Sequence, residues 1–171
     1  LSCAELLRVS RLMKAAKRAK KGIIKDENGQ LKLLPELAEQ LFYDDMLIRR
    51  IDDAILSEEE IADQASPALR DIRRRQRSEN AFVREKLNAI IRSKEHAAHL
   101  QDAIITMRNG RYVVPVKQEY RGNVPGLIHG QSASGATLFI EPMSIVEANN
   151  RLRVLEEEEK QEIERILLEL S

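Results

Sequence analysis

Glycine and proline are gathered in one short part of this 171-residue chain, and this limits where long helices can form. Residues 110–142 hold five of the seven glycines and three of the five prolines, whereas residues 68–109 contain neither type. Glycine weakens helices through its backbone freedom, and proline lacks the N–H that a helix interior needs. We therefore predict a mainly helical α+β protein, in which long helices flank a separate segment of short strands and turns.

The first expected helix covers residues 2–21. Ser2 and Glu5 have the spacing of a capping box, in which each side chain satisfies a backbone N–H of the other. Apolar residues follow three and four positions apart, which is the period of an amphipathic helix. Gly22 is expected to end this helix.

The next stretch is less regular. Asn28-Gly29 indicates a turn, and Pro35 is suited to the first turn of a second helix, where its missing N–H has no partner to lose. The apolar residues that follow Pro35 define one side of this helix less clearly. Residues 51–55 are expected to be a short extended piece.

Two longer helices are predicted beyond this point. Ser66 is suited to cap a helix with Pro67 at its first position, and no glycine or proline follows as far as Leu100, which corresponds to about 50 Å. Its apolar stripe is narrow and interrupted, as in a helix with one neighbour. A last helix runs from about Ile145 to Leu170. We expect these two helices to form a long antiparallel pair with a small antiparallel sheet at its end.

After the long helix the apolar period changes to two, which is typical of strands. Asn109-Gly110 is the strongest signal for a two-residue hairpin turn. Pro115 predicts an edge strand or a bulge, because it cannot donate to a sheet ladder. Further short strands are expected at residues 124–129 and 137–140.

Charge is balanced in total but not along the chain. The 28 basic and 28 acidic residues give a formal net charge of zero. Residues 1–63 carry a net charge of −2, residues 64–102 carry +4, residues 103–145 carry +2 and residues 146–171 carry −4. This asymmetry is more informative than the total, and it predicts that the basic long helix and the acidic last helix attract each other.

Several classes of protein are excluded. Cys3 is the only cysteine, so the chain can form neither an internal disulfide nor a cysteine-based metal site. No apolar run approaches the roughly 20 residues that cross a bilayer, and no signal-peptide pattern opens the chain. We expect a cytoplasmic protein without a membrane partner. The chain begins at Leu1 without an initiator methionine and stops at Ser171 after a helical repeat, so we expect a piece of a longer protein.

Catalytic patterns are absent from the sequence. No phosphate-binding loop of the Gly-x-x-x-x-Gly-Lys-Ser/Thr type occurs. Gly130-Gln-Ser132 begins like a nucleophile elbow, but Ser134 stands where that motif needs glycine. His96 and His99 lack a suitably spaced third ligand, so we place both on a solvated helix face. We therefore expect no catalytic residue, no metal site and no bound cofactor in this chain.

A binding surface remains. The segment rich in glycine combines cationic and hydroxyl side chains with Tyr112 and Tyr120. The candidate nucleic-acid-binding residues are Arg108, Arg111, Lys117, Arg121, His129, Ser132, Ser134 and Thr137. This mixture suits contacts to phosphates rather than to base edges, and binding should therefore depend on salt. The alternative is that these side chains bond among themselves and merely close the helical arm.

The segment closely resembles one known family. The motifs that carry the resemblance are Arg108-Asn-Gly-Arg-Tyr-Val-Val-Pro-Val-Lys117, Tyr120-Arg-Gly122, Val124-Pro-Gly126 and His129-Gly-Gln-Ser-Ala-Ser-Gly-Ala-Thr-Leu-Phe-Ile-Glu-Pro142. They resemble the MutS-II branch of the bacterial MutS-type ATPases, which usually carries a C-terminal Smr nuclease domain. The resemblance is continuous from about residue 65 to residue 171.

The resemblance implies a division of the chain. Residues 1–64 would be part of a helical core domain, residues 65–102 an outgoing lever helix, residues 103–142 a β-rich clamp and residues 143–171 a returning lever helix. The ATPase domain, with its ATP and Mg²⁺, and the Smr endonuclease domain would lie outside this chain. The full-length parent would be a homodimer.

The resemblance also implies a function. The clamp would bind nucleic acid, either branched or mismatched DNA or the ribosomal RNA of stalled and collided ribosomes. The parent would act in suppression of homologous recombination, in DNA repair and in ribosome rescue. An alternative is a protein-interaction module that grips a ribosomal protein or its own dimer mate. An independent enzyme is the least favoured of the three hypotheses.

Overall fold

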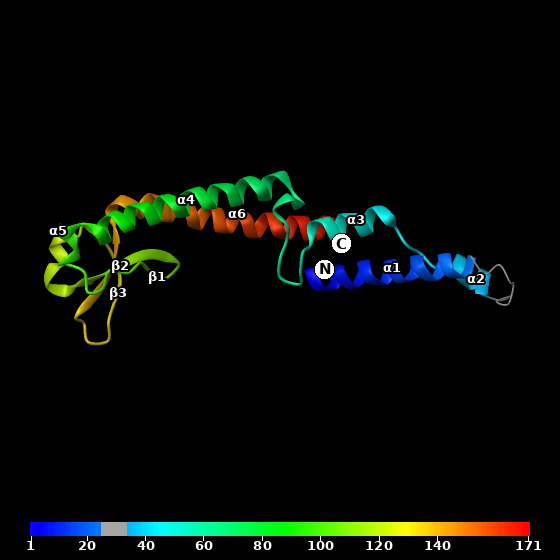
Figure 1. The fold of residues 1–171 in the computed structure, drawn as a ribbon, viewed down its shortest axis with the longest axis horizontal. Helices are drawn as coiled ribbons and strands as arrows, with labels where there is room; N and C mark the ends of the chain where they lie inside the picture. The colour runs from blue at the N-terminus through cyan, green and yellow to red at the C-terminus, as the bar shows by residue number, and fades with distance from the viewer. Residues whose placement is uncertain (25–33) are drawn as a thin grey trace. The chain divides into compact units, whose positions relative to one another are not determined.

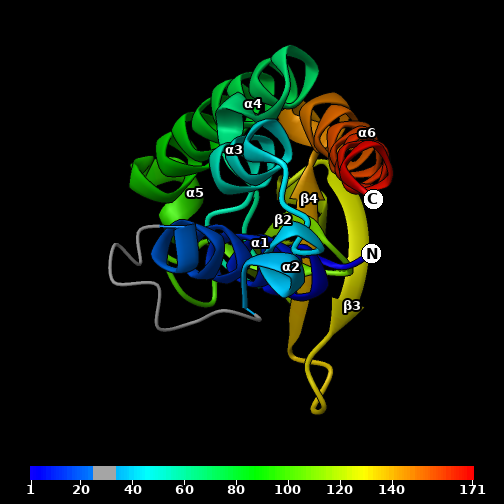
Figure 2. The same cartoon turned by 90° about the vertical axis from the view of Figure 1, so that its right-hand side faces the viewer.

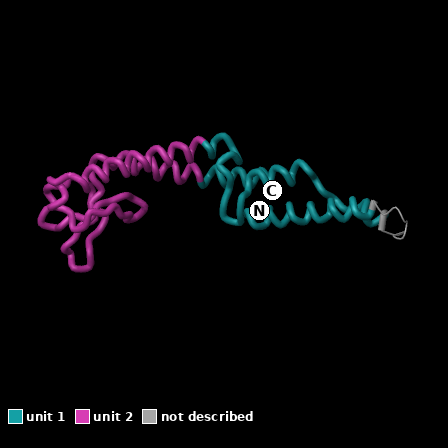
Figure 3. Tube along the Cα trace, viewed as in Figure 1, with its two compact units in different colours: residues 1–70, 160–171 teal, residues 71–159 magenta. Residues whose placement is uncertain are grey.

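The computed structural model describes residues 1–24 and 34–171, so the turn predicted at Asn28-Gly29 lies outside the described residues. The described chain divides into two compact units (Figure 3). Unit 1 contains residues 1–70 and 160–171, and unit 2 contains residues 71–159.

Helix α1 (Cys3–Ile24) opens unit 1. The predicted capping box is confirmed, because the Ser2 N–H donates to Glu5 Oε2 at 2.8 Å and the Glu5 N–H donates to Ser2 Oγ at 3.3 Å. The prediction that Gly22 ends this helix was wrong, since α1 continues through it to Ile24. A helix accepts one glycine at a cost of about 1 kcal/mol relative to alanine, and helix ends are the least certain part of a pattern.

Helices α2 (Leu34–Glu39) and α3 (Asp45–Ala54) replace the single helix expected after Pro35. Asp44 separates them, because its side chain accepts the N–H groups of Met46 and Leu47 and so caps α3. The extended piece predicted at residues 51–55 was therefore wrong. Its first four residues complete α3, because a helical spacing buries both Ile51 and Ala54.

The core of unit 1 joins α1 and α3 to the end of the last helix. Its buried apolar members are Cys3, Leu6, Ile51, Ala54, Ile55, Ile61, Leu69, Ile166 and Leu170. Polar contacts supplement this packing, since Ser10 Oγ donates to Asp52 Oδ1 at 2.7 Å and Lys14 Nζ lies 2.6 Å from Asp52 Oδ2. A short 3₁₀ turn, η1 (Asp63–Ala65), leads out of this core.

Helix α4 (Pro67–Arg92) begins where the sequence predicts. Ser66 Oγ accepts the N–H of Leu69 at 2.9 Å, so Ser66 is the expected N-cap. The helix ends about eight residues before the predicted end, because Ser93 takes an extended conformation (ψ 125°) and starts the four-residue helix α5 (Lys94–Ala97). The 26 residues of α4 therefore span about 39 Å rather than about 50 Å.

The predicted antiparallel pairing of the two long helices is confirmed. Helix α6 (Val146–Leu170) packs beside α4, as Figures 1 and 2 both show. Ion pairs join their basic and acidic sides, with Arg73 Nε 2.7 Å from Glu159 Oε1 and Arg151 Nε 2.7 Å from Glu79 Oε1. From the first pair to the second, the residue number rises along α4, from 73 to 79, and falls along α6, from 159 to 151, which defines the antiparallel direction.

Unit 2 also contains a four-stranded antiparallel sheet in the order β1-β2-β4-β3. Its strands are β1 (Thr106–Arg108), β2 (Arg111–Lys117), β3 (Gly126–Gln131) and β4 (Thr137–Pro142), with 3₁₀ turns η2 (Gln118–Asn123) and η3 (Met143–Ile145). The mainly helical α+β class that the sequence predicts is therefore observed. None of the described helices is both long and apolar enough to cross a membrane.

The predicted hairpin turn is confirmed, with positive φ at both Asn109 (53°) and Gly110 (74°). Pro115 does not lie on an edge strand, because β2 lies between β1 and β4. Its position is nevertheless compatible with proline, since β1 pairs with β2 only as far as Val113. The core of unit 2 packs the sheet against the two long helices through Val83, Leu87, Val114, Val116, Leu138, Ile140, Ile145 and Leu152.

Candidate nucleic-acid interface

Strand register gathers five of the eight candidate residues on one face of the sheet. Arg108 pairs with Arg111 in the β1–β2 hairpin, and Lys117 pairs with Thr137 across β2 and β4. Directly opposed residues point to the same side, and side chains repeat every second position along a strand. His129 joins this face through its contact with Glu141. The sequence could not show this gathering, because it depends on the order of the strands.

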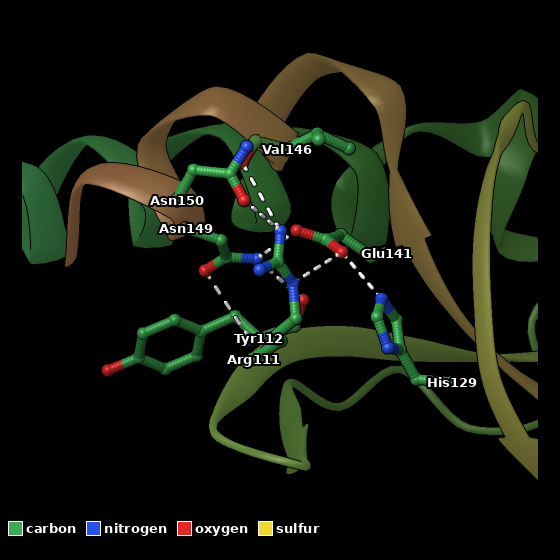
Figure 4. A network of polar contacts seen from close by, with 7 residues as sticks. All are labelled: Arg111, Tyr112, His129, Glu141, Val146, Asn149 and Asn150. Carbon is green, nitrogen blue, oxygen red and sulfur yellow. Dashed lines mark hydrogen bonds and ion pairs between the residues drawn. The ribbon is translucent and has the colours of Figure 1, made fainter. Parts of the chain in front are cut away.

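The central acceptor on this face is Glu141, whose side chain is fully buried. Its Oε2 accepts from Arg111 Nε at 2.8 Å and contacts His129 Nε2 at 2.5 Å, while Oε1 accepts from Asn149 Nδ2 at 2.8 Å (Figure 4). We call Glu141, Arg111, His129 and Asn149 the Glu141 network. It joins β2, β3, β4 and the first turns of α6.

The carboxyl group of Glu141 stays charged in this buried position. Burial alone would raise its pKa, because it disfavours the ionised form. The three hydrogen bonds and the charge of Arg111 outweigh burial, and the pKa of Glu141 lies below its usual value. The network is therefore an ionised buried cluster whose polar groups have partners.

Arg111 and His129 are thus engaged within the protein. The Arg111 guanidinium also donates from Nη2 to Asn150 Oδ1 at 2.7 Å, and its side chain is only 12% exposed. The His129 side chain is 18% exposed. These two residues do not bond to other candidates, as the alternative at the level of sequence expected, but to Glu141 and Asn150. They position the sheet on α6 and present little cationic surface to a partner.

The network extends to α4 through Tyr112. The side-chain amide of Asn149 contacts the backbone of Tyr112, because Asn149 Nδ2 donates to the Tyr112 carbonyl at 3.2 Å. The Tyr112 hydroxyl donates to Asn80 Oδ1 at 2.8 Å, and Asn80 Nδ2 donates to the Gln76 carbonyl at 2.9 Å. Polar contacts therefore fix the sheet to both long helices.

Two strand cations remain available at the surface. The Arg108 guanidinium lies 4.1 Å from the centre of the Phe139 ring in a cation–π contact, and Arg108 remains exposed. Lys117 Nζ donates to the Ala98 carbonyl at 3.1 Å and lies 5.9 Å from the centre of the Tyr120 ring. Neither contact neutralises the positive charge.

Arg121 is the third available cation. It lies in η2, next to the end of β2, and is exposed. Within the described part of the chain it makes no ion pair. The positive charge of Arg108, Lys117 and Arg121 is therefore unopposed by a bound carboxylate, in contrast to that of Arg111.

The hydroxyl candidates line the turn between β3 and β4. Ser132 Oγ accepts the Thr137 N–H at 3.1 Å, Ser134 Oγ accepts the Ala136 N–H at 3.4 Å, and the two hydroxyls lie 3.3 Å apart. Gly135 has φ 75°, which closes the turn. Each serine keeps its exposed or half-exposed position, so its hydroxyl can also donate outward.

The two histidines, His96 and His99, do not lie on a solvated helix face as predicted. His96 and His99 are half-buried, and the His99 ring stacks on Tyr120 with centroids 4.8 Å apart. This follows from the early end of α4, which turns His99 away from a continuous helix. Among the described residues, no group of three or more His, Cys, Asp or Glu side chains could hold a metal ion.

The chain is similar in sequence to a group of known proteins. No family model matches the chain. It is 50% identical over 173 residues to the endonuclease MutS2 of Ruminiclostridium cellulolyticum, and 50% identical over 173 residues to that of Geobacillus thermodenitrificans. Both alignments cover the whole chain, and a third, to MutS2 of Alkaliphilus metalliredigens, is 62% identical over 71% of the chain. The chain is homologous to one region of the MutS2 endonucleases.

This homology confirms the predicted resemblance to the MutS-II branch. The chain spans about 22% of the length of the first two MutS2 relatives and about 16% of the third. These relatives are named as endonucleases.

Sequence reasoning missed the residues that hold this MutS2 region together. Glu141 closes a strand beside Pro142 and was given no role, and neither was Asn149. A charged residue inside an apolar strand is a signal, because buried carboxylates require partners. The identity of those partners depends on packing between strands and helices, which no single-sequence pattern gives.

Proposed function

We propose that residues 103–142 form a clamp that binds the sugar-phosphate backbone of nucleic acid. Three exposed or half-exposed cations, Arg108, Lys117 and Arg121, carry this proposal, because no carboxylate among the described residues pairs with them. Thr137 pairs with Lys117 across β2 and β4, and Ser132 and Ser134 add hydroxyl groups in the turn before Thr137. Homology to a region of nucleases supports a polyanionic partner.

Rigidity supports the same proposal. The Glu141 network fixes the sheet to α6, and the Tyr112–Asn80 contact fixes it to α4. Fixed cations lose little conformational freedom on meeting phosphates, so more of the interaction is kept as affinity. Contacts of this type position a protein on nucleic acid without reading its sequence.

We further propose that the helices carry motion to the clamp. Residues 65–102 and 143–171 would be the two levers, and residues 1–64 part of the helical core. The Arg73–Glu159 and Arg151–Glu79 ion pairs couple the levers, so a rotation at one end would move the other end as one piece. The drive would come from an ATPase domain of the parent that uses ATP and Mg²⁺, with two parents acting as a homodimer.

The partner would be a large, shaped nucleic acid. Branched or mismatched DNA and the ribosomal RNA of stalled or collided ribosomes both offer closely spaced phosphates. The parent would then act in suppression of recombination, DNA repair or ribosome rescue. In this proposal the chain binds and does not catalyse, so cleavage of nucleic acid or hydrolysis of ATP by the purified chain would contradict it.

The test is a comparison of three proteins with a fluorescein-labelled 30-base-pair DNA duplex. R108Q/K117Q/R121Q should bind about tenfold or more weakly at low salt, because each neutralised cation removes a phosphate contact. R49Q/R70Q/R153Q removes the same charge at exposed arginines elsewhere and should bind nearly as the wild type does. Equal binding by all three proteins in fluorescence anisotropy would overturn the proposal.

One observation favours a protein partner instead. β3 is an edge strand whose Leu127 and Ile128 side chains are 45% and 41% exposed. Apolar residues on an open edge suit pairing with a strand of a ribosomal protein or of the dimer mate. Under this second hypothesis L127S/I128S abolishes partner binding, whereas R108Q/K117Q/R121Q leaves it intact.

A further inference from the structure

A second basic surface lies on α1, which belongs to unit 1. Seven basic residues occur in the described part of α1, against the single acid Glu5. They divide into a set with partners in unit 1 and a set that is exposed. Only the exposed set is available to bind another molecule.

The lysines on the inner sides of α1 are already engaged. Lys14 pairs with Asp52 at 2.6 Å, and Lys17 pairs with Asp45 at 2.5 Å. Lys20 donates to the carbonyls of Glu39 and Leu41 at 3.4 Å each. These three lysines hold α1 against the polypeptide that follows it.

The arginines face outward. Arg8, Arg11 and Arg18 are exposed along one side of the helix, and Lys21, which is also exposed, lies toward the edge of that side. We call these four residues the basic face of α1. Within the described residues none of the four makes an ion pair, and only Glu5, one turn before Arg8, lies close enough to lower the local positive charge. The basic face extends over about 20 Å of helix.

Small residues separate these cations. Ala15 and Ala19 are exposed between the arginines, and Gly22 follows them on the same side. A Cβ added to Gly22 would meet no atom within 4 Å, so packing does not require a glycine there. A helix interior with glycine costs up to about 1 kcal/mol relative to alanine. Because the side chains between the arginines are small, an extended partner can approach the helix closely.

We propose that the basic face of α1 is a second nucleic-acid contact, which binds backbone phosphates independently of the clamp. Arginine presents a planar fork that matches phosphate oxygens, and here the arginines are the cations left outward. Duplex DNA carries one charge per about 1.7 Å when both strands are counted, so about 20 Å of helix matches a length of duplex with about six phosphates on each strand. A rigid row of cations suits such a partner better than a single compact anion.

The rest of α1 argues against a membrane. A helix that lies on a bilayer inserts an apolar side. The apolar side of α1 is used in the core of unit 1, where Leu6 is 1% exposed, and Leu12 is the one large apolar side chain on the basic face. The packing of α1 therefore leaves charge, and not apolar area, for a partner.

The first test uses R8Q/R11Q/R18Q, because glutamine preserves helix propensity at exposed positions. With the labelled DNA duplex and an RNA duplex of the same sequence, the slope of log K against log salt should become shallower by about 2 to 3. R49Q/R70Q/R153Q should keep the wild-type slope. The inference is overturned if the two triple variants behave alike on both duplexes.

Two further probes decide the class of partner. Poly-L-glutamate and vesicles of phosphatidylserine carry negative charge without a nucleic-acid backbone. If R8Q/R11Q/R18Q loses binding to either probe but retains binding to both duplexes, the nucleic-acid assignment is wrong. Such a result would not contradict the proposal for the clamp, because R108Q/K117Q/R121Q is measured separately on the same duplexes.

The second test places the partner on the helix. A photoreactive benzophenone side chain at Ala15, in the middle of the basic face, should crosslink to the labelled duplex at low salt. The same group at Glu164, which is exposed on α6 in unit 1, is the control and should not. Absence of a crosslink at Ala15 while the wild type binds the duplex would overturn the inference.

Discussion

At the scale of single residues, the buried carboxylate of Glu141 distinguishes two chemically similar side chains, Arg108 and Arg111. Arg108 and Arg111 are paired across the hairpin, yet Arg111 is bound to Glu141 whereas Arg108 lies on Phe139 and keeps its charge exposed. The sequence predicted both arginines as equal candidates. It could not separate them, because the distinction comes from which of them reaches Glu141.

Glu141→Gln tests how much the Glu141 network contributes to the free energy of unfolding. The substitution removes the charge that balances Arg111, and breaking a buried pair by removing one partner costs about 3–5 kcal/mol. We expect the free energy of unfolding at pH 7, measured with urea, to fall by that amount. Glu158→Gln, at a half-exposed ion pair with Arg75, should lower it by less than about 1 kcal/mol. Equal effects of the two substitutions would show that the network contributes little.

The network also predicts a dependence on pH. The folded-state pKa of Glu141 lies below its usual value, so its stabilisation is complete above about pH 4.5. It is lost as the pH falls through the folded-state pKa. Between pH 5 and pH 3 the wild type should therefore lose more stability than Glu141→Gln does.

Gly126→Ala tests a close approach between two strands. An added Cβ would lie 2.7 Å from Ile140 Cγ2 and would also collide with the backbone carbonyl of Glu141. We expect a loss of about 1–3 kcal/mol in the free energy of unfolding, because β3 must move away from β4. Gly122→Ala is the matched control, since a Cβ there meets nothing within 4 Å. A variant at residue 126 as stable as this control would contradict the packing.

At the scale of elements, patterns fixed the starts of helices better than their ends. Ser2 and Ser66 cap helices as predicted, because a cap depends on local hydrogen bonds. The ends of α1 and α4 were misplaced by three and about eight residues. Gly22 permitted α1 to continue, and Ser93 interrupted α4 without any glycine or proline to signal it.

Ser66→Ala tests the start of α4. Ser66 Oγ caps Leu69 and donates to Glu162 Oε1 at 2.6 Å, so its removal should cost about 1–2 kcal/mol in urea unfolding at pH 7. Hydrogen bonds from Arg165 and Ser66 lower the pKa of Glu162 to about 2. The part of the loss that involves Glu162 is therefore present above about pH 4.5 and shrinks as the pH falls toward 2. Ser78→Ala, exposed on the same helix, should be nearly neutral.

At the scale of the whole molecule, a net charge of zero does not oppose a polyanionic partner. Glu158 and Glu159 of α6 are used in ion pairs with α4, and Glu141 is buried with Arg111. Cations without such partners include Arg108, Lys117 and Arg121 in unit 2 and the basic face of α1. Binding therefore depends on which charges are left unpaired, and their sum along the chain does not reveal this.

The salt dependence of DNA binding tests the central claim most directly. For the wild type and for R108Q/K117Q/R121Q, log K for the 30-base-pair duplex is measured against log salt. Each lost phosphate contact makes the slope shallower by about 0.9, so the variant should differ from the wild type by about 2.7. A difference of this size supports a clamp that binds phosphates through Arg108, Lys117 and Arg121. Identical slopes for the two proteins would contradict it.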